Sequence, residues 1–91
     1  MIRDMGMTHR DFFRTFPAVA GNRPWQAEDD AVKLELTKGS VTVRLGPEGT
    51  RKLGLLTLPI TRLEFEFTDH EPGQVADFMA RFDLSFRRGG G

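Results

Sequence analysis

The chain has 91 residues, carries 13 basic and 13 acidic side chains, and contains no cysteine. This length corresponds to a single domain, 1–91, and the balanced charge creates no overall field that would attract nucleic acid or an anionic membrane. The absence of cysteine excludes disulfides, thiolate catalysis and cysteine-rich zinc sites.

The composition and the N-terminal residues predict a cytoplasmic location. No stretch approaches the roughly 20 apolar residues of a membrane span, and the N-terminus has no apolar run typical of a secretory signal. A domain without disulfides relies on packing alone, which suits a reducing compartment. We therefore expect neither a nucleic-acid nor a membrane partner.

A short amphipathic helix is predicted from residue 9 to residue 16, after a flexible segment at residues 1–7. Thr8 followed by Asp11 resembles a capping box, in which the first side chain accepts a backbone hydrogen bond. Pro17 is expected to end this helix, because proline lacks the N–H that the helical hydrogen bond requires. The apolar stripe of the helix consists of Phe12, Phe13 and Phe16.

Alternating apolar and polar residues predict four consecutive strands, after an irregular segment at residues 17–30. The first two strands, 32–36 and 41–45, form a hairpin. Pairing Leu36 with Val41 brings all the alternating apolar side chains of both strands onto one face, so the periodicity and the turn agree on this register.

The third strand is predicted at residues 51–58 and the fourth at residues 62–67, with a turn at residues 58–60. In one register Leu56 and Leu58 point away from the core, whereas the core face receives Leu53 and Leu55. A shift of one residue reverses this arrangement, and the pattern of the third strand leaves the choice open.

The second helix is predicted from residue 71 to residue 86. It begins after Asp69, with Pro72 in its first turn, where proline is tolerated. Its apolar side chains recur at helical spacing, and we expect Phe82 among them to be buried against the sheet. The predicted fold is therefore α+β: a four-stranded antiparallel β-meander with an N-terminal and a C-terminal helix packed on one face.

No residue pattern points to catalysis, a cofactor or a metal. The sequence Asp69-His70-Glu71 fits the start of a helix better than a metal site, because adjacent side chains point in different directions. No serine has a recognisable base partner, and no phosphate-binding loop is present. We therefore expect a protein that is not an enzyme.

The end of the chain, Arg87-Arg88-Gly89-Gly90-Gly91, is expected to be flexible over residues 89–91. Three other interpretations stay open: a peptide that docks on a partner, a carrier or modifier tail that reacts through the Gly91 carboxylate, and a single RNA-binding Arg-Gly-Gly element.

The candidate binding surface is the outer face of the sheet. Leu56 and Leu58 would form an apolar patch there, and we include Trp25, Arg44 and Arg62 in the site, because apolar residues framed by charges are typical of interfaces. The alternative is that segment 17–30 crosses this face and covers the leucines with Trp25. The predicted function is a small protein-binding module that contacts a partner or a second copy. Its alternatives are a carrier or modifier acting through the terminal glycine, and a small-ligand-binding domain.

Overall fold

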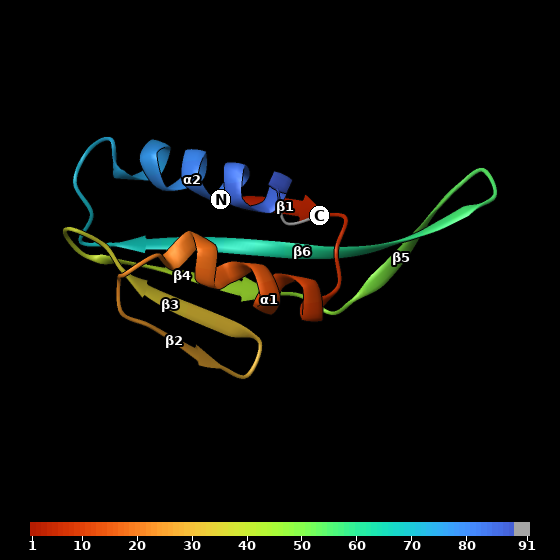
Figure 1. The fold of residues 1–91 in the computed structure, drawn as a ribbon, viewed down its shortest axis with the longest axis horizontal. Helices are drawn as coiled ribbons and strands as arrows, with labels where there is room; N and C mark the ends of the chain where they lie inside the picture. The colour runs from red at the N-terminus through yellow and green to blue at the C-terminus, as the bar shows by residue number, and fades with distance from the viewer. Residues whose placement is uncertain (89–91) are drawn as a thin grey trace.

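The computed structural model describes residues 1–88. It contains an antiparallel sheet with two helices packed on it (Figure 1). The elements in chain order are β1 (Ile2–Met5), α1 (His9–Ala20), β2 (Trp25–Glu28), β3 (Ala31–Glu35), β4 (Ser40–Leu45), β5 (Gly49–Leu53), β6 (Leu56–Thr68) and α2 (Gln74–Arg88). The strand order is β1-β6-β4-β3-β2, and β5 pairs with β6 outside this path.

Both helices cover the same face of the sheet (Figure 1). In the core, the ring of Phe82 on α2 lies 5.2 Å from that of Phe65 on β6. The two helices also meet, since Phe12 of α1 stacks on Phe86 of α2 with 5.5 Å between the ring centroids. Phe82 is fully buried, as predicted. The α+β class is confirmed.

The predicted number of strands was wrong, because the sheet has six strands rather than four. Residues 1–7, predicted to be flexible, contain β1, which pairs with β6, and end at Met7, a core residue. Segment 17–30, predicted to be irregular, contains the last residues of α1 and strand β2, which pairs with β3. Both missed strands have only four residues, too few to show a clear alternation.

Helix α1 has the predicted start and a later end. The side chain of Thr8 accepts a hydrogen bond from the backbone N–H of Asp11 at 3.1 Å, as the capping pattern predicts. The prediction that the helix ends at Pro17 was wrong, since Pro17 lies inside it. Val19 and Ala20 in the final turn are buried in the core, and this burial offsets the hydrogen bond that proline cannot make.

The hairpin of β3 and β4 has the predicted faces but a different register. Val41 pairs with Leu34 rather than with Leu36. The turn is responsible, because Leu36 donates its N–H to the carbonyl of Gly39 at 3.0 Å and so belongs to the turn. Side chains alternate with a period of two, so this shift of two positions keeps the same apolar residues on the core face.

The start of helix α2 lies at Gln74, after rather than before Pro72. The backbone N–H of Glu71 donates to the side-chain oxygen of Gln74 at 2.7 Å. Farther along the helix, Asp83 forms an ion pair with Arg3 of β1. This contact fixes the first strand to the last helix.

The predicted turn at residues 58–60 was wrong, because β6 runs through Pro59 without interruption. The chain instead turns at Gly54 and Leu55, between the paired residues Leu53 and Leu56. Consequently β4 pairs directly with the second half of β6, and β5 pairs only with its first half. The β5–β6 hairpin therefore projects beyond the helix-covered part of the sheet (Figure 1).

Candidate functional site

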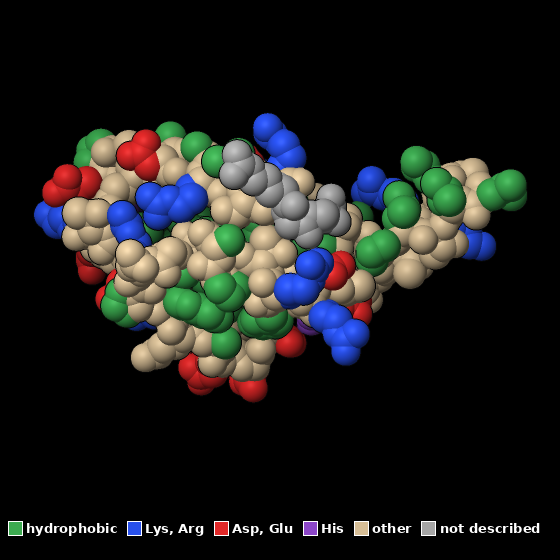
Figure 2. Space-filling view, in the orientation of Figure 1, with side chains coloured by type: hydrophobic (Ala, Val, Ile, Leu, Met, Phe, Trp, Pro, Cys, Tyr) green, Lys and Arg blue, Asp and Glu red, His purple; other side chains and the backbone are tan. Residues whose placement is uncertain are grey.

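The projecting β5–β6 hairpin exposes four leucines to solvent. Leu55 at the turn is 104% exposed, Leu56 62%, Leu53 59% and Leu58 41%. Figure 2 shows hydrophobic side chains gathered on this projection, with basic side chains beside them. A cluster of exposed large apolar side chains on one element marks an interaction surface more often than scattered single residues do.

The turn of the hairpin explains why these leucines gather. Gly54 has a φ of +63° and is followed by a residue with negative φ, the combination of a type II′ turn, which prefers glycine at its first central position. The turn sets Leu53 opposite Leu56 and Arg51 opposite Leu58. Cross-strand partners share a face, so these four side chains form one surface, which we call the leucine face.

The leucine face continues along β6 into the outer face of the sheet. Alternation along the strand places Ile60, Arg62 and Glu64 on the same side as Leu56 and Leu58. A hollow of about 460 Å³ lies where the hairpin leaves the sheet, and Ile60, Arg62 and Arg44 line it. The predicted association of Leu56 and Leu58 with Arg44 and Arg62 on one face therefore agrees with the strand register, although the leucines lie farther out.

The two arginines of this hollow are held by acidic neighbours. Arg44 donates to Glu66 at 2.9 Å, and its other terminal nitrogen lies 4.0 Å from Glu64. Arg62 donates from Nε to Asp4 at 2.9 Å. The outer face of β4 and β6 thus carries exposed ion pairs, whereas four of the exposed leucines lie together on the hairpin.

The Asp4–Arg62 pair gives a testable pH dependence. The hydrogen bonds from Arg62, together with its charge, hold the pKa of the Asp4 carboxyl below its ordinary value. A lowered pKa in the folded protein means that the pair stabilises the fold at neutral pH and that this contribution disappears as the pH falls through the folded-state pKa. We expect Arg62→Gln to raise the pKa of Asp4, as measured by NMR titration of its carboxyl carbon.

Asp11 provides the internal control for this titration. Its pKa is lowered by hydrogen bonds from Arg14 and Thr8, and it lies on α1, which covers the face of the sheet opposite to the outer face that carries Arg62. Its pKa should not change in Arg62→Gln. An unchanged pKa of Asp4 in the variant, or an equal rise at both aspartates, would show that Arg62 does not hold the Asp4 carboxylate.

Trp25 does not join the leucines. It lies on β2 at the other edge of the sheet, opposite Leu34, and its ring packs edge-on against Phe16 of α1 at 5.2 Å. It therefore belongs to the helix-covered face. The alternative in which segment 17–30 covers Leu56 and Leu58 with Trp25 is wrong, because both leucines are exposed.

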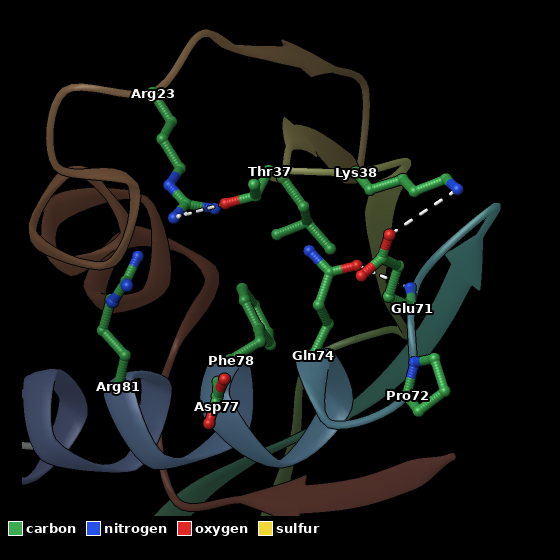
Figure 3. A pocket seen from close by; sticks show the side chains of 10 residues that line it. Arg23, Thr37, Lys38, Glu71, Pro72, Gln74, Asp77, Phe78 and Arg81 are labelled. Atoms are coloured by element: carbon green, nitrogen blue, oxygen red, sulfur yellow. Dashed lines mark hydrogen bonds and ion pairs between the residues drawn. The ribbon is translucent and has the colours of Figure 1, made fainter.

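A second hollow, also of about 460 Å³, lies between the start of α2 and the β3–β4 turn (Figure 3). The side chain of the buried Phe78 lines it. On its rim Lys38 lies 3.6 Å from Glu71, and Arg23 donates to Thr37 at 3.3 Å. Because most of these polar groups bond to one another on an open surface, we place the candidate site at the hairpin. A small-ligand-binding function stays an alternative prediction.

Neither histidine belongs to a metal-like cluster. His70 packs beside the ring of Phe67 at 5.8 Å, and the Nε2 atom of His9 lies 2.7 Å from the carbonyl oxygen of Gly46. Within residues 1–88, no group of three or more histidine, aspartate or glutamate side chains gathers as a metal ion would require. In the same range no helix has both the length and the apolar character needed to cross a bilayer.

The interpretations of the C-terminal tail concern residues 89–91, which lie outside the described part of the chain. A carrier or modifier role for Gly91 therefore stays a prediction.

A scan against protein-family models gives no match, and searches of curated proteins and of solved structures give none either.

Two members of the leucine face were missed by sequence reasoning. Leu53, like the exposed Leu55, was placed on the core face in the register that turns Leu56 and Leu58 outward, and Arg51 was not singled out. The available signal was Gly54, which stands between apolar residues in the position that a type II′ hairpin turn requires.

Proposed function

We propose that this chain is a cytoplasmic protein-binding module that contacts its partner through the leucine face of the β5–β6 hairpin. The single observation that carries the proposal is the exposure of Leu53, Leu55, Leu56 and Leu58 together on an element that extends beyond the core. The cytoplasmic location is supported by the cysteine-free composition.

The leucines of the leucine face contribute little to the stability of the isolated chain. None of its leucines belongs to the buried core or packs against it. Burying a leucine side chain is worth about 1.5–3 kcal/mol, so a partner that covers several of them gains substantial affinity. The adjacent ion pairs of Arg44 and Arg62 form a polar border, which is the usual arrangement around an apolar contact.

A photo-cross-linking amino acid at Leu55 tests the proposal in cells of the source organism. We expect a small set of discrete adducts, and we expect Leu56→Gln to lower their yield about tenfold or more, in line with the roughly 1.5–3 kcal/mol of a buried leucine. The mass of the adduct shows whether the contacted molecule is another protein or a second copy of this chain.

Thr57→Gln is the matched control, because Thr57 neighbours Leu56 on the same exposed strand and points to the opposite face. It should leave the adducts unchanged. The proposal fails if Leu56→Gln has no effect, or if a cross-linker at Glu35, on the outer face of β3, gives the same adducts as one at Leu55.

A further inference from the structure

We infer that the free edge of β5 binds an acidic, extended segment of the partner, which adds a strand beside β5. This inference rests on the proposed function and specifies the chemistry of the partner. Within residues 1–88, β5 pairs with β6 on one side only, and all five of its residues are exposed.

The hydrogen-bonding groups of this edge are identified by the hairpin register. The pairs Leu53–Leu56 and Arg51–Leu58 follow the two-residue turn, so these residues exchange hydrogen bonds within the hairpin. The backbone N–H and C=O groups of Thr50 and Lys52 consequently point away from β6. An extended peptide can pair with them, as in other cases of strand addition to a sheet edge.

The opposite edge of the hairpin is less suitable. Its outward-pointing backbone groups belong to Thr57 and Pro59, because Pro59 pairs with Thr50 in a position that does not exchange hydrogen bonds. Proline has no N–H to donate, and proline on an edge strand discourages pairing. The hairpin therefore has one edge open to an added strand and one edge that is blocked.

The charge of the hairpin selects an acidic partner. Residues 49–60 contain Arg51 and Lys52 and no acidic residue. Arg51 lies on the leucine face and Lys52 on the other face, so an added strand meets a positive charge on both sides. Opposite charges on neighbouring strands are favourable, and like charges are not.

The same charges disfavour a second copy of this chain on the edge. In the symmetric antiparallel register that pairs all five residues of two β5 strands, Arg51 lies opposite its own copy, where like charges repel. A lipid surface is also disfavoured, because hydrocarbon offers no partner for the free N–H and C=O groups of Thr50 and Lys52. An acidic extended segment can both pair with these free backbone groups and balance the positive charges of Arg51 and Lys52.

The probe is a capped eight-residue peptide in which valine and glutamate alternate, titrated into the full-length, isotope-labelled protein and followed by NMR. We expect saturable shifts in β5, slower hydrogen exchange at the amides of Thr50 and Lys52, and at least fivefold weaker binding of the matched valine–lysine peptide. Lys52→Glu should reverse this preference between the two peptides.

Two substitutions at one position isolate the backbone contribution. Thr50→Pro removes the outward N–H and should weaken peptide binding at least fivefold, whereas Thr50→Val keeps the N–H and a β-branched side chain and should bind as the wild type does. The hairpin shifts of each variant without peptide report whether it folds. If Thr50→Pro unfolds the hairpin, the added strand is tested by the amide exchange of Thr50 and Lys52 and by the peptide preference of Lys52→Glu.

The outcomes separate this inference from the proposed function. If Leu56→Gln loses the cellular adducts but the peptide does not protect the amides of Thr50 and Lys52, the proposed contact through the leucine face stands. The inference of an added strand beside β5 is then overturned. Equal binding of both peptides, or no binding of either, overturns it as well. Protection of the two amides by self-association, or by neutral phosphatidylcholine vesicles instead of the peptide, assigns the edge to another occupant and also overturns it.

Discussion

Phe82→Ala is expected to lower the free energy of unfolding by about 3–5 kcal/mol, the range for emptying a buried aromatic site. Phe82 is fully buried, and its ring contacts the rings of Phe65, Phe78 and Phe86 at centroid distances of 5.2, 6.0 and 4.3 Å. Removing it opens a cavity between α2 and the sheet. Urea denaturation followed by circular dichroism measures the loss.

Leu84→Ala is the matched control for this experiment. Leu84 lies on the same helix but is 47% exposed, so its truncation should cost less than about 1 kcal/mol, as at most surface positions. If Phe82→Ala does not fold, Phe82→Leu retains part of the contact and should give a smaller, measurable loss. A loss below about 1 kcal/mol for Phe82→Ala would mean that α2 does not depend on this contact with the sheet.

The core of the fold was predictable because alternation determines which side chains share a face. Val41 lies on the core face in both the predicted and the observed register, since the two registers differ by two positions. The register itself depends on how many residues the turn takes. Neither the alternation nor the turn residues determine this, and Leu36 belongs to the turn because of its hydrogen bond to Gly39.

Pro59 shows why the candidate site was only partly predictable. A proline between two apolar runs is a strong turn signal, and it led to a predicted turn at residues 58–60. In the fold its nitrogen faces the side of β6 on which β1 pairs only with residues 61–64, so no N–H is required at Pro59 and the strand continues. Alternation still placed Leu56 and Leu58 on the face of Arg62. To predict that these leucines lie on a projecting hairpin, one must know that β6 continues through Pro59.

Gly39→Ala is expected to destabilise the protein by roughly 2–5 kcal/mol, because two effects add at this position. Gly39 has a φ of +74°, a conformation that costs a residue with a Cβ atom about 1–2 kcal/mol. A Cβ atom there would also lie 2.0 Å from the carbonyl oxygen of Thr68 and 2.6 Å from that of Asp69. Backbone atoms cannot rotate away as a side chain can, so relieving the overlap must separate the β3–β4 turn from the end of β6, at a further cost of about 1–3 kcal/mol.

Gly73→Ala separates the two effects. Gly73 has a φ of +90°, but nothing lies within 4 Å of a Cβ atom built on it, so only the conformational cost of about 1–2 kcal/mol applies. Both variants are measured by urea denaturation, and NMR spectra should show the largest shifts of Gly39→Ala at the end of β6 and the residues that lead to α2. Equal losses in the two variants would show that the β3–β4 turn does not approach Thr68 and Asp69 closely, and that the connection from β6 to α2 is held by other contacts.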